Sequence, residues 1–286
     1  MKRTSEEAGL PQLADIFFKA PDQVDPDSLM SGIVNVYNFR SWWNAILAVP
    51  KSCFESRASI YIRALSHLPG SYKLWYNLLK EARSFVKQFS ILDQQSYYDA
   101  VNEIHKRALN QYMFSMPKIW IDYAKFLQKQ QKITQVRQTY VKALQSLPSA
   151  QHGLIWSEAL NWSIGLARKN KRFALIAQNF YRRYLKLKPE KTQDYLEFLL
   201  EMDLLEDSLT LYAQILSRTD LKLQKSEKEL WMEWAEFIAK YPQRATHIDA
   251  ETILREATEK YPEEASKLWI YRADYYSRMG LFARAR

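Results

Sequence analysis

The stretch KIWIDYAKFLQKQQKI, residues 118–133, places three large rings, Trp120, Tyr123 and Phe126, at intervals of three. On a helix of 3.6 residues per turn these rings share one face, and polar residues such as Lys125 occupy the opposite face. The stretch therefore predicts an amphipathic helix. Three rings so close together could form a ligand cage, a platform for stacking nucleic-acid bases, or a packed core.

The same spacing recurs along the chain, and this recurrence favours the core. A binding cage is expected once in a protein, whereas a packing position is expected in every repeat. The recurring positions that we expect in the core are Trp42, Trp75, Trp120 with Tyr123 and Phe126, Trp156 with Trp162, Tyr195 with Phe198, Trp231 with Trp234 and Phe237, and Trp269 with Tyr275. In one repeat Thr192 stands where the tryptophan is expected.

A second pattern lies between successive tryptophan positions. It reads tyrosine, any residue, a basic residue, alanine and leucine, and then proline, as in TYVKALQSLP (139–148) and FYRRYLKLKP (180–189). A small alanine lets the neighbouring helix approach. Proline ends a helix because it has no N–H to donate and restricts the residue before it. This pattern adds further positions to the expected structural core of the repeats: Tyr140, Ala143, Pro148, Tyr181, Pro189 and Pro262.

The anchors at positions 42, 75, 120, 156, 192, 231 and 269 are 33, 45, 36, 36, 39 and 38 residues apart. This spacing is typical of repeats of two helices. We therefore expect an all-α fold, a right-handed α-solenoid of about six and a half helix pairs over residues 29–286. An irregular arm is expected over residues 1–28. Because the sequence stops inside a repeat, we also expect it to be a fragment of a longer solenoid.

The composition argues against several classes of protein. Only six of the 286 residues are glycine, which disfavours a parallel α/β enzyme, and one cysteine excludes a disulfide scaffold. The four histidines, His67, His105, His152 and His247, lie far apart in sequence and show no metal-ligand spacing. No phosphate-binding loop, dinucleotide-binding motif or nucleophile elbow occurs. We expect no catalytic residue, no cofactor and no metal, and neither a membrane span nor a small-molecule substrate.

The formal net charge of +9 makes an acidic partner plausible. One repeat holds a concentration of basic residues: Arg168, Lys169, Lys171, Arg172, Arg182 and Arg183. They could contact RNA phosphates, attract an acidic segment of a protein, or simply be solvated. The sequence leaves these three possibilities open.

The two patterns together resemble the HAT (half-a-TPR) repeat. The longer stretches SYKLWYNLLK (71–80), MPKIWIDYAKFL (116–127), RQTYVKALQSLPSAQHGLIW (137–156) and YRRYLKLKPE (181–190) resemble the N-terminal part of the Syf-one family of pre-mRNA splicing factors. This family, also called XPA-binding protein two, is a sister of the Crooked-neck-like proteins. The resemblance covers about residues 30–286.

The resemblance implies a nuclear, non-enzymatic scaffold of the spliceosome, within the Nineteen complex. Its implied partners are the Crooked-neck-like HAT protein, other Nineteen-complex subunits and the Aquarius-type helicase, with RNA close by. It also implies a link to transcription-coupled repair. The alternatives are a direct RNA-binding HAT module and a HAT or TPR scaffold of another complex, for example in 3′-end processing or ribosome biogenesis.

Overall fold

The computed structural model describes residues 33, 35–89, 91, 95–217, 225–245 and 248–285. The described residues form helices joined by short links, with no strand among them. The expected all-α repeat fold is therefore confirmed. The arm expected over residues 1–28 lies outside the described residues. Contacts divide the chain into two units, one ending at Glu158 and one beginning at Ala159.

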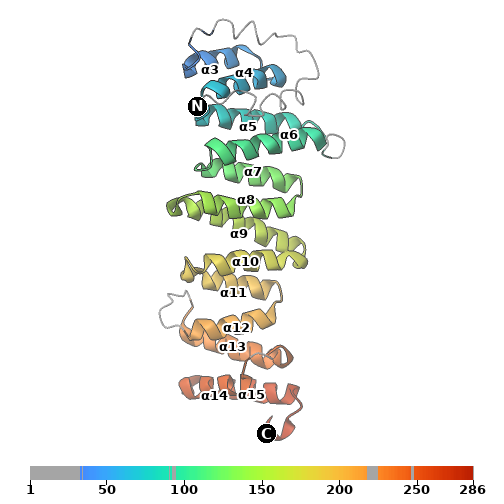
Figure 1. Ribbon diagram of the computed structural model, residues 1–286. Coiled ribbons are helices and arrows are strands. Elements are labelled where there is room, and N and C mark those ends of the chain that lie inside the picture. Colours follow the sequence, from blue (N-terminus) through green and yellow to red (C-terminus); the bar gives the residue numbers. More distant parts are fainter. Residues whose placement is uncertain are drawn as a thin grey trace. The chain divides into compact units, whose positions relative to one another are not determined.

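Among the described residues, the first unit contains the helices α3 to α8 and the start of α9 (Figure 1). Each helix from α3 to α7 packs on the next one in the chain, as the two-helix period requires. The helices are α3 (Phe39–Ala48), α4 (Phe54–His67), α5 (Tyr72–Val86), α6 (Gln95–Arg107) continued by a π-helical turn (Ala108–Tyr112), α7 (Pro117–Lys129) and α8 (Ile133–Ser146). Helix α9 (His152–Lys169) begins in this unit.

The second unit begins within α9 and also consists of helices that follow one another through short links. Helices α11 to α15 pack in chain order, and α13 also contacts α15. The helices are α10 (Ala174–Tyr184), α11 (Thr192–Glu201), α12 (Leu205–Leu216), α13 (Glu227–Lys240), α14 (Ala250–Lys260), α15 (Ala265–Arg278) and α16 (Phe282–Ala285).

Local sequence signals explain where several helices begin and end. Pro117 occupies the first turn of α7, where no N–H is needed. A capping box of Ser226 and Glu229 starts α13. The repeat prolines Pro148, Pro189 and Pro262 follow α8, α10 and α14. Pro148 precedes a 3-10 turn, and Pro189 and Pro262 each begin one. All three are exposed, so the expectation that they belong to the core is wrong, because they lie in the links between helices.

Most of the recurring rings lie in the interior. The buried members are Trp42, Trp75, Trp120, Tyr123, Phe126, Tyr140, Trp156, Tyr181, Tyr195, Phe198, Trp231 and Trp234, together with the small Ala143. Trp162, Phe237 and Tyr275 are only half-buried. Trp162 lies beside the buried residues of α9, which include the small side chains of Ala159, Ser163 and Ala167.

The expectation that Trp269 belongs to the core is wrong, because its side chain is 54% exposed. In α15 the buried residues are Leu268 and Tyr276. One residue corresponds to about 100° of rotation around a helix, so Trp269 lies beside the packed face. The guanidinium of Arg272 lies 5.1 Å from the centre of its ring.

A buried ion pair joins α3, α4 and α5 and has no signature in the repeat pattern. Arg57 is 3% exposed and makes two bonds of 2.8 Å to the carboxylate of Glu81. Its Nη1 also donates to the carbonyl oxygens of Ile46 (2.6 Å) and Val49 (2.7 Å). The hydroxyl of Tyr61 donates to Glu81 at 3.1 Å. Arg57 thus connects the end of α3 with α4 and α5.

His105 of α6 is fully buried and serves the core. Its ring stacks on Tyr123, with centroids 4.9 Å apart. Nδ1 lies 2.8 Å from the carbonyl oxygen of Val101, which can only accept, so Nδ1 carries the proton. Nε2 then accepts from Arg83 at 3.1 Å. Burial lowers the pKa of His105 to about 3 and keeps the imidazole neutral.

Candidate protein-interaction surface

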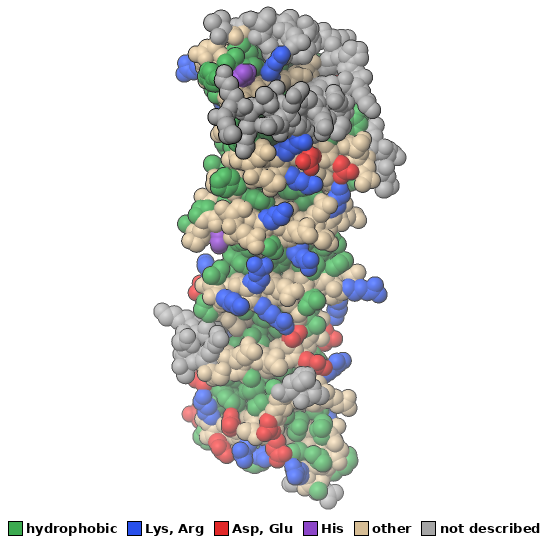
Figure 2. Space-filling view, viewed as in Figure 1, with side chains coloured by type: hydrophobic (Ala, Val, Ile, Leu, Met, Phe, Trp, Pro, Cys, Tyr) green, Lys and Arg blue, Asp and Glu red, His purple; other side chains and the backbone are tan. Residues whose placement is uncertain are grey.

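The structure places the predicted basic residues in two groups. Arg168 and Lys169 end α9, and Lys171 and Arg172 belong to the 3-10 turn that follows. Arg182 and Arg183 lie in the last turn of α10. Ten residues of helix rise about 15 Å, so the two groups flank opposite ends of α10 and do not form one patch. On the face drawn in Figure 2, Lys and Arg side chains are likewise interspersed with other side chains.

Arg168 is already paired within the second unit. Its Nε and Nη2 donate to the carboxylate of Glu201, at the end of α11, over 2.7 and 2.9 Å. These bonds hold the pKa of Glu201 below its usual range. A bidentate pair uses the donors that a phosphate would need. The α9 group therefore offers Lys169, Lys171 and Arg172 to an anion.

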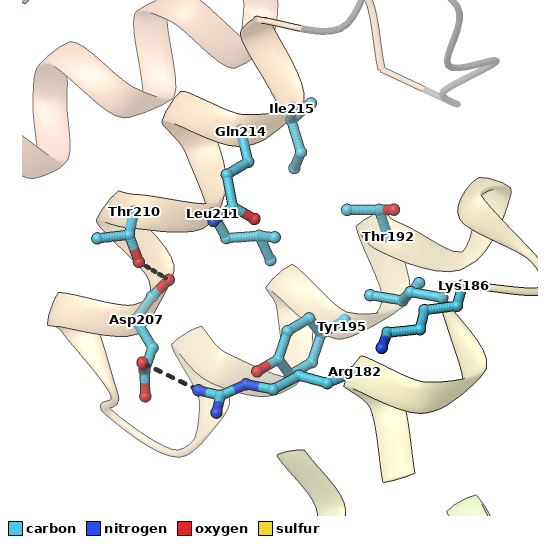
Figure 3. Close-up of a pocket in the computed structure, with 10 residues that line it drawn as sticks. Arg182, Lys186, Thr192, Tyr195, Asp207, Thr210, Leu211, Gln214 and Ile215 are labelled. Atoms are coloured by element: carbon cyan, nitrogen blue, oxygen red, sulfur yellow. Dashed lines mark hydrogen bonds and ion pairs between the residues drawn. The ribbon is translucent and has the colours of Figure 1, made fainter. Parts of the chain in front are cut away.

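A groove lies between α10, α11 and α12, with a volume of about 390 Å³. This volume is within the roughly 300–1,000 Å³ typical of ligand pockets. Figure 3 shows the lining side chains, which come from all three helices and from the link after α10. Its apolar part consists of Leu185, Tyr195, Leu211 and Ile215, and its polar part consists of Arg182, Lys186, Thr192, Asp207, Thr210 and Gln214.

Two cations flank the ring of Tyr195 in this groove (Figure 3). The guanidinium of Arg182 points toward Asp207, with 3.4 Å between the nearest nitrogen and oxygen. Gln178 donates to the other carboxylate oxygen of Asp207 at 2.7 Å. Lys186 forms no ion pair with any carboxylate of the described residues. The lining cations therefore outnumber the lining carboxylates, and the groove favours an anionic partner group.

Burial raises the pKa of the Tyr195 phenol, while the nearby Arg182 opposes the rise. The phenol is thus neutral near pH 7. Its ring is 4% exposed and stacks on Tyr181 at 4.9 Å. A ring packed in this way contributes apolar surface to the groove but offers no open face for a stacked base.

The first unit contains a group of partly exposed rings that the repeat pattern did not predict. Phe39 and Trp43 of α3 stack at 5.7 Å, and the Nζ of Lys73 lies 4.2 Å from the centre of the Trp43 ring. These side chains come from two helices, α3 and α5, so the spacing of residues within one helix does not predict their contact. The Lys73 ammonium already occupies a cation–π position over these rings.

The described residues contain no group of three or more His, Cys, Asp and Glu side chains placed to hold a metal ion. His67 stacks on Trp42 at 5.8 Å, and His152 lies 2.8 Å from the carbonyl oxygen of Leu147. His247 lies outside the described residues. None of the helices in the described ranges combines the length and the apolarity that crossing a membrane requires.

Comparison with known families decides what kind of repeat this is. Residues 32–190 match the family described as the pre-mRNA-splicing factor Syf1/CNRKL1 N-terminal HAT repeat. The chain belongs to this family. Residues 192–286 match the Syf1 middle HAT repeat, so the two Syf1 matches together cover nearly all of the sequence. The expected HAT-repeat membership is confirmed.

Individual Syf1 proteins agree with this assignment. The syf1 homolog of Drosophila melanogaster is 37% identical over 88% of the chain, and human SYF1 is 33% identical over 96%. The splicing factor cwf3 of Schizosaccharomyces pombe is 31% identical over 87%. The alignments cover 28% to 31% of these three relatives. The chain thus spans about three tenths of the length of the Syf1 proteins it matches.

Proposed function

We propose that this chain is a non-enzymatic protein-interaction scaffold that acts in pre-mRNA splicing in the nucleus. The observation that carries the proposal is the match of nearly the whole chain to the N-terminal and middle HAT repeats of Syf1. Relatives over most of the chain are named as pre-mRNA-splicing factors. Paired helices with a shared core suit this role, because each repeat adds surface without needing a catalytic centre.

The proposed partners are Nineteen-complex subunits, including the Crooked-neck-like HAT protein, and the Aquarius-type helicase. The α10–α12 groove supports a protein partner, since its apolar lining and its flanking cations suit a segment with both apolar and acidic side chains. A short ordered surface of this kind holds one partner segment at a time. Several such surfaces along the repeats would hold different subunits in a fixed geometry.

Crosslinking mass spectrometry of the native complex in nuclear extract tests the proposal. Exposed lysines on the repeat surface, such as Lys169 and Lys186, provide the reactive groups. We expect crosslinks from these lysines to Nineteen-complex proteins. Crosslinks confined to the chain itself, in an extract where other spliceosomal proteins crosslink to one another, would overturn the scaffold role.

The alternative of a direct RNA-binding module makes a different prediction. If the basic residues contacted phosphates, a gel shift with structured RNA would weaken steeply as salt rises. The pairing of Arg168 with Glu201 and the separation of the two basic groups argue against one continuous phosphate track. We expect RNA binding by the purified chain to be weak at physiological salt.

A further inference from the structure

The α10–α12 groove has a counterpart in the first unit, and one of the differences between the two is at the position of the repeat tryptophan. A groove of about 200 Å³ is lined by Trp120 and Tyr123 of α7, by residues of α8 and by the end of α6 with its π-helical turn. The same offset of 72 residues separates Trp120 from Thr192, Tyr123 from Tyr195, and Thr139 from Leu211. The two grooves are thus repeat equivalents, and the second is about twice as large.

At three positions in the first unit, the repeat tryptophan is anchored by the same hydrogen bond. Its Nε1 donates to the backbone carbonyl six residues earlier, from Trp42 to Val36 (2.7 Å), from Trp75 to Pro69 (2.8 Å) and from Trp120 to Phe114 (2.9 Å). The indole therefore fills the space between its own helix and the preceding link.

Thr192 does not reach that position. Its hydroxyl donates to the carbonyl oxygen of Pro189, three residues earlier, at 2.5 Å. The residue six positions before it is Lys186, which lines the enlarged groove. A short side chain thus stands where the equivalent groove has an indole, and the larger groove is open beside Thr192, Tyr195 and the link after α10.

We propose that this groove receives an aromatic side chain, best an indole, from an acidic segment of a partner protein. The aromatic ring occupies the volume that the repeat tryptophan fills elsewhere, against Leu185, Leu211 and Ile215. Acidic residues beside it in the partner lie near Arg182 and Lys186. The inference specifies the partner chemistry of the scaffold surface and rests on the proposed function for the partner being a protein.

The polar lining favours a peptide over RNA. Asp207 stands in the groove with its carboxylate held by Gln178 and Arg182. A carboxylate there repels a phosphate but can accept the N–H of an indole or of a peptide backbone. The Arg182 guanidinium, 3.4 Å from Asp207, is close enough to be shared with a second carboxylate at the groove entrance.

Binding of a defined probe to the purified chain tests the inference. The probe is a fluorescently labelled peptide with one tryptophan between acidic residues, and its control replaces the tryptophan with alanine. We expect the tryptophan peptide to bind more tightly by a factor on the order of 30, as for a buried interface tryptophan. Equal affinity of the two peptides would overturn the aromatic pocket.

A variant that fills the groove separates loss of binding from loss of folding. Thr192→Trp restores the repeat tryptophan, so we expect an unchanged or higher melting temperature and a loss of peptide affinity of about 30-fold. Thr192→Val keeps the groove open and is the matched control, with affinity close to that of the unmodified chain. Undiminished binding by a folded Thr192→Trp chain would show that the groove is not the site.

Two further measurements define the partner class. Lys186→Glu should weaken peptide binding and reduce its dependence on salt, while a uridine-rich RNA oligonucleotide should not compete. Competition by the RNA would overturn a protein partner.

The scaffold role is tested separately by crosslinking of the unmodified chain in nuclear extract. Peptide binding without those crosslinks would overturn the scaffold role and support the aromatic pocket. Crosslinks without peptide binding would support the scaffold role and overturn the aromatic pocket.

Discussion

Arg57 and Glu81 form a two-bond ion pair between α4 and α5, and Arg57 also holds two carbonyl groups at the end of α3. The hydrogen bonds with Glu81 raise the pKa of Arg57, which therefore stays charged. A buried pair of this kind contributes little relative to apolar residues of the same size, but removing one partner leaves the other charge unpaired.

Truncation of Arg57 should therefore be strongly destabilising. For Arg57→Met we expect the free energy of unfolding to fall by about 3 kcal/mol, because Glu81 remains partly buried without its partner. Chemical denaturation monitored by circular dichroism measures the change. Arg168→Met, which breaks the exposed pair with Glu201, serves as the control and should leave the midpoint nearly unchanged. A smaller effect at Arg57 than at Arg168 would contradict this account.

Truncation of two tryptophans at equivalent repeat positions should reduce stability to very different extents. Trp120 is 4% exposed and donates to Phe114, so Trp120→Ala should cost about 3–5 kcal/mol and lower the melting temperature. Trp269 lies half in solvent, so Trp269→Ala should change stability far less. Calorimetry of both variants tests the difference. Equal losses at the two sites would mean that α15 is packed differently from what the structure shows.

His105 should make stability fall when the solution becomes mildly acidic. Its pKa is lowered from near 6.5 in the unfolded chain to about 3 in the fold, so the unfolded chain takes up a proton first as pH decreases. The contribution of His105 to the free energy of unfolding is therefore complete above about pH 6.5. As the pH falls toward 3, the free energy of unfolding decreases by at most about 1.4 kcal/mol per pH unit. The free energy of unfolding, measured between pH 5 and 7, should depend less steeply on pH in His105→Gln than in the unmodified chain. Glutamine is chosen because it keeps an acceptor for Arg83. Parallel pH profiles would contradict the prediction.

The amides of Asn102 and Gln130 exchange two hydrogen bonds of 2.9 and 3.1 Å between α6 and the end of α7. Asn102→Leu leaves the buried Gln130 amide without this partner, Gln130→Met does the same to Asn102, and each single variant should cost about 1–3 kcal/mol. The double variant Asn102→Leu with Gln130→Met removes both polar groups, so it should lose less than the sum of the single variants. A double-mutant cycle measures this coupling, and strict additivity would argue against the pair.

The helices could be predicted from the sequence because each is amphipathic on its own. The rings of α7 and the alanines of the following helices repeat with the helical period, so local spacing was enough to locate them. Trp269 shows the limit of that reasoning. The tryptophan pattern marks a helix but does not fix which of two adjacent residues, Leu268 or Trp269, points into the core.

The buried polar partners could not be predicted in the same way. Arg57 and Glu81 are 24 residues apart, and neither belongs to a repeating pattern. Their contact depends on how two helices are rotated about their own axes, which the sequence encodes only through the whole packing arrangement.

The candidate site was predicted in part. Arg182 lines the groove, whereas the basic residues around Arg172 lie at the other end of α10, because neighbours in sequence are separated by a full helix. Thr192 was recognisable as a departure from the repeat, but a departure alone does not reveal a hollow. The volume became visible only when the surrounding side chains were in place.

The short side chain of Thr192 has a mechanical consequence. In a chain of repeats, each neighbour supports the next, and the array opens first where that support is weakest. We expect the amides around Thr192 to exchange with solvent sooner than those around Trp120. Binding of the partner's aromatic side chain in the groove would fill the space beside Thr192. We therefore expect the bound peptide to slow the exchange of these amides and to stabilise the repeat array where its packing is weakest.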